Sequence, residues 1–233
     1  MVPTLREKAP PPKDINYQQL SLSLNPTRAH RERSTQSNPL MKILLWNCRG
    51  ANGADFRRNL KAVLSWNNPT MVCFTETKMK KAANEALMVE FWFTNMLHVD
   101  AIGYSEGMIM LWREHEVAHV DPIAATNQEI HANVQVSTSS QPCILSWVYA
   151  STSFNNKKIR WDNLEHISVS HAQHWILCGD FNEITSAVDK FGGNPINNNR
   201  ANALLDCLQN INMVDLRFTG SRFTWSNLRT KEH

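Results

Sequence analysis

Three groups of polar residues each follow a mostly apolar run of the sequence. Asn47 follows MKILLW, Glu76 follows MVCFT, and the pair Asp180 and Asn182 follows HWILCG. Polar side chains just beyond the ends of buried strands gather at one rim of a sheet, where ligands bind. An amide, a carboxylate and an Asp/Asn pair form an oxygen-rich site, which suits Mg²⁺ or Mn²⁺ better than Zn²⁺. These cations serve phosphoryl chemistry because they neutralise charge on phosphate oxygens.

Each of these polar residues also has an ordinary structural explanation. A single Asp or Asn at the end of a strand commonly forms a turn or caps a helix. The shared placement of all three groups is what favours a site. Cys48 lies beside Asn47 in the sequence, but a nucleophilic thiol needs a partner base, and none is indicated, so Cys48 is expected to be a core thiol.

The surrounding pattern predicts alternating strands and helices. Phe56, Leu60 and Val63 recur at helical spacing, and Pro69 ends that helix. Further helices are expected at 79–92, 157–170 and 199–211, and strands at 41–47, 71–76, 96–100, 107–112, 129–137, 143–150, 174–180 and around the Gly-Ser turn of the segment RFTGSRFTWSN. This order predicts a layered α/β (α+β) domain of two sheets with helices outside.

The chain divides into a leader at 1–40 and a domain at 41–233. Residues 1–40 hold six of the ten prolines, no glycine and a net charge of +3. Such a segment buries too little apolar area to offset its ordering entropy, so we expect it to be disordered. The domain carries no net charge. Binding of a nucleic acid would therefore need a local basic groove.

Composition excludes several classes of protein. Hydrophobic residues make up 42% and charged residues 19%, which is typical of a globular chain. No apolar stretch approaches the ~18 residues of a membrane span, and no secretory signal is evident, so we expect no membrane partner. The five cysteines are scattered without a paired spacing, which favours reduced thiols in an intracellular protein.

The motifs WNCRG, FTETK, VYAS, GDFNE, GGNP and MVDLRFTGSRFTWSN occur in this order. The set resembles the endonuclease/exonuclease/phosphatase superfamily, and more narrowly the endonuclease domain of plant non-LTR (long interspersed) retrotransposons. The resemblance implies a DNase-I-like, four-layered two-sheet sandwich flanked by helices. It also implies divalent-metal-dependent phosphodiester hydrolysis, with Mg²⁺ (or Mn²⁺), a DNA substrate, no small-molecule cofactor and a nuclear location.

The same resemblance implies a role for each matching residue. Asn47 would lie beside the metal and the phosphate, and Glu76 would bind the metal. Tyr149 would contact the scissile phosphate. Asp180 would position or deprotonate the attacking water, and Asn182 would orient the transition state.

The chain departs from the family pattern at three places. Relatives that act on abasic sites carry an Asp where this chain has Arg49, and relatives usually carry Gly-Gly where this chain has Glu106 and Gly107. After Trp225 no strand with a further Asp and no Ser-Asp-His motif follows, so we expect the last strands of the fold to be missing.

The missing C-terminal motifs lead to an alternative hypothesis, in which the chain is an inactive truncated remnant with at most weak nucleic-acid binding. A further alternative keeps the fold but changes the substrate, with the chain as a phosphoesterase that acts on phospholipid or inositol phosphates. The segment after Asn212 favours the nuclease class over the phosphoesterase.

Several other residues are candidates for contact with a nucleic acid. A cluster of cations is expected either to touch phosphate or to form a solvated helix face: Arg57, Arg58, Lys78, Lys80 and Lys81. Residues Asn194–Asn199 follow a Gly-Gly pair, which indicates a loop, and the resemblance places this loop near the DNA.

Overall fold

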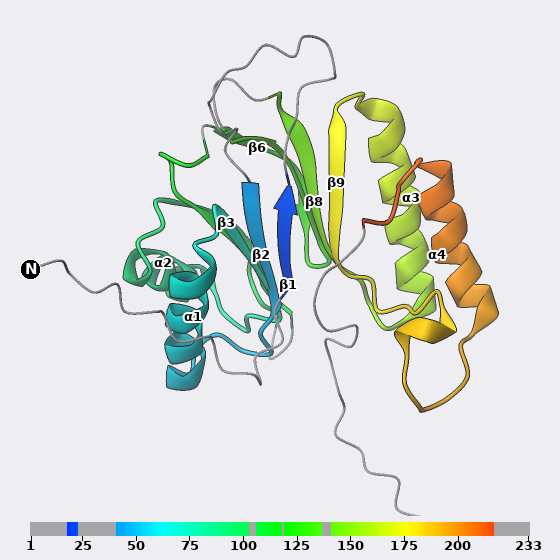
Figure 1. Ribbon diagram of the computed structural model, residues 1–233, viewed down its shortest axis with the longest axis horizontal. Coiled ribbons are helices and arrows are strands. Elements are labelled where there is room, and N and C mark those ends of the chain that lie inside the picture. The colour runs from blue at the N-terminus through cyan, green and yellow to red at the C-terminus, as the bar shows by residue number, and fades with distance from the viewer. Residues whose placement is uncertain (1–17, 23–40, 103–105, 118, 137–140, 217–233) are drawn as a thin grey trace, which may run out of the picture.

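The computed structural model describes residues 18–22, 41–102, 106–117, 119–136 and 141–216, with the backbone alone at 18–22. The described strands form two sheets (Figure 1). The first sheet has the order β1 (Gln18–Leu22), β2 (Met41–Asn47), β3 (Met71–Thr75), β5 (Met108–Trp112) and β4 (Asn95–Val99). The second has the order β6 (His119–Thr126), β7 (Glu129–Gln135), β8 (Cys143–Tyr149) and β9 (His174–Asp180).

Each sheet contains one pair of parallel strands joined by a helix. Strands β2 and β3 are parallel, and α1 (Ala54–Asn67) connects them. Strands β8 and β9 are parallel, and α3 (Phe154–Ser170) connects them. Parallel neighbours need such a crossover, and it brings the carboxyl ends of the two strands to the same edge of the sheet. These two units carry the residues that sequence analysis selected.

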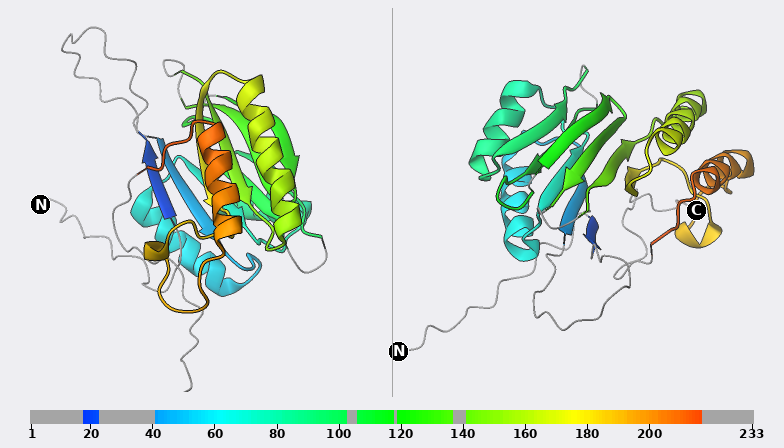
Figure 2. Two further views of the ribbon diagram at one scale, coloured as in Figure 1. Left: turned by 90° about the vertical axis from the view of Figure 1, so that its right-hand side faces the viewer. Right: turned by 90° about the horizontal axis from the view of Figure 1, so that it is seen from above.

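Helices cover the outer face of each sheet. Phe56, Leu60 and Val63 of α1, with Leu87 of α2 (Lys81–Glu90), pack against the outer face of the first sheet. Trp161 and Leu164 of α3 pack with α4 (Asn198–Asn210) on the outer face of the second sheet. The views in Figure 2 show this order of layers.

The two sheets pack face to face on an apolar core. Because successive side chains of a strand point to opposite faces, Ile43 and Leu45 of β2 face the second sheet while Leu44 faces α1. Leu145 and Trp147 of β8 meet the first sheet from the other side. The four layers are therefore helices, sheet, sheet and helices, and the predicted α/β sandwich is confirmed.

Two strands differ from the sequence-based expectations. Residues 18–22, expected to be disordered, form β1, which pairs antiparallel with β2 and supplies backbone partners to its outer edge. Strand β6 was not predicted because Pro122 interrupts it. Its pairing with β7 shifts between Pro122 and Ala124, and an edge strand tolerates a proline that a central strand would not. The rest of the leader and the predicted strands after residue 216 lie outside the described residues.

The other predicted elements are present with shifts of a few residues at their ends. Helix α1 ends at Asn67, and Asn68 adopts a left-handed conformation that returns its N–H to the carbonyl of Leu64. Pro69 follows directly, as expected. No helix in the described part of the chain is both long enough and apolar enough to cross a membrane.

Candidate active site

The two parallel strand pairs deliver the candidate residues to the same edge of the sandwich. In the first sheet Asn47 pairs with Thr75, so Glu76 follows one residue beyond that pair. In the second sheet Tyr149 pairs with Asp180. Each βαβ unit therefore contributes one amide or hydroxyl and one carboxylate.

Glu76 joins the two halves of the site. Its Oε1 accepts a hydrogen bond of 2.7 Å from Nδ2 of Asn47 in the same sheet. The same oxygen accepts a bond of 2.8 Å from the hydroxyl of Tyr149 in the second sheet. Hydrogen bonds to an ionised carboxylate are among the stronger ones in proteins. The carboxylate thus fixes both neighbours and ties the sheets together at this edge.

Tyr149 stands in a strongly acidic setting. Burial raises the pKa of its hydroxyl well above the ordinary value, and the hydrogen bond to Glu76 and the charges of Glu76, Asp180 and Glu106 raise it further. The hydroxyl therefore remains protonated and acts as a hydrogen-bond donor. Asp180 contributes to this shift as the strand partner of Tyr149.

The setting of Tyr149 predicts a specific titration behaviour. Of the three tyrosines of the chain, Tyr149 should not ionise between about pH 9 and 11, where an ordinary tyrosine titrates. Absorbance at 295 nm should therefore rise equally in the wild type and in Tyr149→Phe over this range. Glu76→Gln removes the charge that opposes ionisation, so it should bring more tyrosine signal into the range. A smaller rise in Tyr149→Phe than in the wild type would contradict the prediction.

Asp180 and Asn182 form a tight turn directly after β9. Oδ1 of Asp180 accepts the backbone N–H of Asn182 at 2.9 Å. Nδ2 of Asn182 donates to the carbonyl oxygen of Ala150 at 2.6 Å, which connects the turn to the end of β8. Asn182 has a φ of 47°, a left-handed conformation that Asn tolerates better than most residues. The side chain of Asn182 therefore holds the turn on β8, beside the Asp180 carboxylate.

The donor set at Asn47 and Glu76 fits a divalent cation with oxygen ligands. Oδ1 of Asn47 is buried and has no hydrogen-bond partner among the described residues. An orphaned acceptor of this kind costs free energy unless it binds a donor or a cation. Both hydrogen bonds to Glu76 use Oε1, so Oε2 carries neither. Mg²⁺ is commonly held by one or two carboxylates, with water and substrate phosphate completing its shell. Within the described ranges no group of three or more His, Cys, Asp or Glu side chains is placed so that it could hold a metal ion by itself.

A cavity of about 260 Å³ opens beside Glu76 and Tyr149. It has room for a hydrated cation with a phosphate group, since each water occupies about 30 Å³. Its walls come from both sheets: Glu76, Lys78, Glu106, Tyr149, Ala150, Ser151 and Thr152.

The candidate cations differ in their placement. Lys78 lines the cavity and is exposed. Arg57 instead binds Glu90 at 2.8 Å and the carbonyl oxygen of Asn52 at 2.6 Å, which holds α1 to α2. Arg58 pairs with Asp55 of its own helix. Lys78 is therefore the cation of this group that the structure brings to the site.

Cys48 does not line the cavity and is partly buried against the core beneath α1. Its Sγ donates to the carbonyl oxygen of Thr75 at 3.2 Å. Burial raises the pKa of the thiol to about 12, with a smaller contribution from the charge of Glu76. The thiol is therefore protonated, which agrees with a core residue and not with a nucleophile.

The turn between β6 and β7 supports the site and was missed by sequence analysis. The carbonyl oxygen of Gln128 accepts the backbone N–H of Tyr149 at 2.7 Å, and its side-chain Oε1 accepts the N–H of Ser151 at 2.9 Å. Asn127 donates to the carboxylate of Glu106 at 2.9 Å. The turn joins β7 to β6, a strand that the sequence analysis does not predict. The Asn-Gln dipeptide is therefore the one local feature from which this turn could be predicted.

The segment Asn194–Asn199 is a loop only in part. Asn197 caps α4 by accepting the N–H of Arg200 at 3.2 Å, and Asn198 and Asn199 lie in the helix. The loop interpretation is therefore wrong for these residues, because the Asn-rich run contains its own helix cap.

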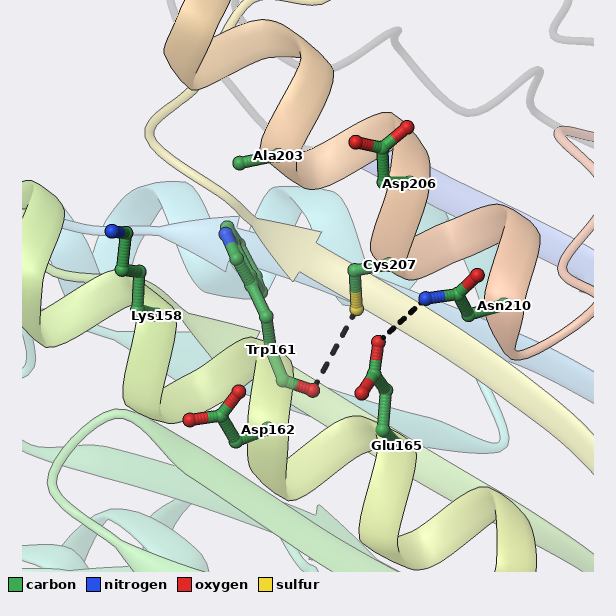
Figure 3. Close-up of a pocket in the computed structure, with 8 residues that line it drawn as sticks. All are labelled: Lys158, Trp161, Asp162, Glu165, Ala203, Asp206, Cys207 and Asn210. Atoms are coloured by element: carbon green, nitrogen blue, oxygen red, sulfur yellow. Dashed lines mark hydrogen bonds between the residues drawn. The ribbon is translucent and has the colours of Figure 1, made fainter.

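A second cavity, of about 290 Å³, lies between α3 and α4 (Figure 3). Asn210 donates to Glu165 at 3.0 Å across it, and the Cys207 thiol points to the carbonyl oxygen of Trp161. It shares no lining residue with the first cavity.

The comparisons with known proteins agree with this arrangement. The sequence pattern of the Endonuclease/Exonuclease/phosphatase family matches residues 44–231. The chain belongs to this family. The match includes every residue that sequence analysis assigned to the site. None of the curated proteins matches the chain.

Solved structures of this fold are similar at low sequence identity. An AP endonuclease from Archaeoglobus fulgidus is 17% identical, with 72% of this chain and 70% of that chain covered and a TM-score of 0.54. The AP endonuclease LMAP from Leishmania major is 13% identical, with coverages of 74% and 67% and a TM-score of 0.56. The 3' phosphatase NExo from Neisseria, bound to a product DNA hairpin, is 18% identical, with coverages of 72% and 71% and a TM-score of 0.53. At these identities the likeness establishes the fold alone.

Proposed function

We propose that this chain hydrolyses phosphodiester bonds with a divalent metal, and that it nicks DNA as retrotransposon endonucleases do. Membership of the endonuclease/exonuclease/phosphatase family supports phosphoester hydrolysis as the chemical class. The observation that carries the proposal is the bonded group Asn47–Glu76–Tyr149, with Asp180 as the strand partner of Tyr149 and a cavity at its side.

Glu76 and Asn47 are the residues that would hold the cation. The carboxylate of Glu76 supplies the negative charge, and the orphaned Oδ1 of Asn47 supplies a neutral oxygen. A divalent cation bound there would neutralise charge on the phosphate oxygens. Mg²⁺ is our first choice and Mn²⁺ the second, because both prefer oxygen ligands.

Asp180 and Tyr149 act on the substrate from the second sheet. Asp180 sits in a turn that fixes its Oδ1, and its carboxylate would accept a proton from an attacking water. Tyr149 stays protonated, so its hydroxyl would donate to a phosphate oxygen as charge develops there. Asn182 holds the turn and, with the second proton of its amide, would contact the same phosphate.

The choice of DNA as substrate rests on the motif set. WNCRG, FTETK and GDFNE occur in the order of the retrotransposon endonucleases, and Lys78 brings a cation to the cavity wall. The structural neighbour NExo was solved with a DNA hairpin, which is consistent with this substrate in the fold. The proposal carries the expectation that the protein works in the nucleus.

The decisive test is nicking of supercoiled plasmid by the purified chain in Mg²⁺ and in EDTA. We expect conversion to open circles in Mg²⁺ only. Asp180→Asn, purified identically, serves as the control for contaminating nucleases and should nick about 100-fold more slowly. Far-UV circular dichroism checks that both preparations are folded.

The same preparations distinguish the alternatives. Release of inorganic phosphate from inositol phosphates, without nicking, would replace the nuclease proposal with a phosphoesterase. A folded chain that acts on neither substrate would identify an inactive member of the family. Equal nicking by the wild type and Asp180→Asn would show that the observed activity does not come from this site.

A further inference from the structure

Helix α3 buries a lysine behind the turn that carries Asp180. The side chain of Lys157 is fully buried, with 0% of its surface exposed, whereas its neighbour Lys158 is exposed. A lysine is almost never fully buried unless it is paired, because removing an ammonium group from water is costly. Its contacts must therefore compensate for that cost.

Those contacts all lie on the segment directly after β9. Nζ of Lys157 donates to the backbone carbonyl oxygen of Asn182 and to Oε2 of Glu183, the latter at 2.7 Å. Arg200 of α4 donates through Nε to the same Oε2 at 2.9 Å. Two helices on the outer face of the second sheet thus converge on the GDFNE segment.

Asn182 is held from three sides as a result. Lys157 binds its carbonyl oxygen, Ala150 binds its side chain, and its own N–H binds the carboxylate of Asp180. These three contacts hold Asn182 in its left-handed conformation, with a φ of 47°. Loss of the lysine would free the peptide that follows Asn182, and the Asp180 carboxylate is bonded to the peptide that precedes it.

We propose that Lys157 is a positioning residue, which fixes Asn182 through its carbonyl oxygen and thereby orients the Asp180 carboxylate. We call the group of Lys157, Glu183 and Arg200 the clamp. Glu183 supplies the negative charge that Lys157 faces, and Arg200 binds the same carboxylate from α4. The catalytic consequence rests on the proposed function, whereas the effect on the geometry of the turn does not.

The directions of the pKa shifts of Lys157 and Glu183 agree with this geometry. Burial lowers the pKa of Lys157, although the hydrogen bond and charge of Glu183 oppose that effect. Burial would raise the pKa of Glu183, but the bonds from Lys157 and Arg200 outweigh it and hold that pKa below its usual value. Glu183 therefore opposes the effect of burial on Lys157, and Lys157 and Arg200 favour the charged form of Glu183.

The first arm of the test measures how firmly the turn is held, by hydrogen exchange and without any substrate. In Lys157→Met, which keeps an unbranched side chain but removes the ammonium group, hydrogen exchange of the amides at 180–184 should accelerate about tenfold or more relative to the wild type. Exchange in β2 and β3 should not change. Lys158→Met is the matched control, because it removes the neighbouring exposed lysine and should leave the exchange at 180–184 unchanged.

The second arm reads catalysis. In Lys157→Met, kcat for plasmid nicking should fall about 100-fold while KM for DNA changes less than about threefold, since misplacement of a catalytic group by 1 Å can cost that much. Lys157→Arg keeps a cationic donor at this fully buried position and should restore part of kcat. Arg200→Met removes the half-exposed donor to Glu183 and keeps Lys157. We expect smaller changes in hydrogen exchange and in kcat than in Lys157→Met.

The outcomes separate this inference from the proposed function. If the wild type nicks nothing but exchange at 180–184 is faster in Lys157→Met, the clamp is supported and the nuclease is refuted. Unchanged exchange and unchanged kcat in Lys157→Met would overturn the clamp. If Lys157→Met does not fold, Arg200→Met decides, and unchanged exchange at 180–184 in that variant would also overturn it.

Discussion

Glu76→Gln is expected to lower kcat/KM for Mg²⁺-dependent nicking by on the order of 10³-fold, which corresponds to about 4 kcal/mol of transition-state stabilisation. Glutamine keeps an oxygen at the position of Oε1, so Asn47 and Tyr149 can still donate their hydrogen bonds. The substitution therefore removes the charge of the site with little change in its shape. A loss of activity would therefore show that the reaction needs the charge of Glu76, as expected for a residue that holds the cation.

The measurement is a plasmid-nicking rate over a series of Mg²⁺ concentrations. We expect the half-saturating Mg²⁺ concentration to rise in Glu76→Gln, because an uncharged amide, with an NH₂ group in place of Oε2, replaces the carboxylate. The melting temperature should change by no more than a few degrees, since both hydrogen bonds persist.

Glu106→Gln provides the comparison, because Glu106 lines the same cavity and also carries one negative charge. Its carboxylate accepts from Asn127 and touches neither Asn47 nor Tyr149 in the described contacts. We expect its effect on kcat/KM to stay below about tenfold. Equal losses in the two variants would show that the overall charge of the cavity matters, and not the specific group at Glu76.

Much of this arrangement could be predicted from the sequence because it depends on local pattern. The apolar runs before Asn47 and Asp180 identify central strands, and the helical pattern between paired runs indicates a parallel crossover. Polar residues at the ends of such strands must then meet at one edge of each sheet. The structure places Asn47, Glu76, Tyr149 and Asp180 there, and their catalytic roles remain predictions.

Other features depend on packing between distant segments, which no local pattern encodes. The bond between Glu76 and Tyr149 joins residues of different sheets, and it exists only because the sandwich closes at this edge. Lys157 falls in a predicted helix, where a lysine normally indicates a solvated face. Its burial follows from the position of the GDFNE segment over α3, a tertiary relationship.

The two unexpected strands have a different cause. Residues 18–22 contain an alternation of Leu and polar residues that is typical of a strand, but the prolines on either side masked it. Pro122 likewise argues against a strand at β6, although an edge position and a shift in register accommodate it.

Gly179→Ala is expected to destabilise the fold by about 4 kcal/mol or more. Gly179 has a φ of 137°, which a residue with a side chain rarely adopts. A Cβ at this position would lie 1.9 Å from the carbonyl oxygen of Val148 and 2.7 Å from its carbonyl carbon. Val148 is the strand partner of Gly179, so the methyl group could be accommodated only by separating β8 from β9.

Gly192→Ala separates the cost of a positive φ from the cost of the steric clash with Val148. Gly192 also has a positive φ, of 72°, but no atom lies within 4 Å of the position that a Cβ would take there. Alanine at Gly192 should cost only the backbone term, about 1–2 kcal/mol. For a chain of this size, 1 kcal/mol shifts the melting temperature by about 2–4 °C.

Thermal unfolding followed at 222 nm should therefore place Gly179→Ala at least about 8 °C below the wild type, with Gly192→Ala between the two. Similar melting temperatures for the two variants would mean that β8 and β9 do not approach each other this closely at Gly179, and the geometry that places Asp180 beside Tyr149 would then have to be revised.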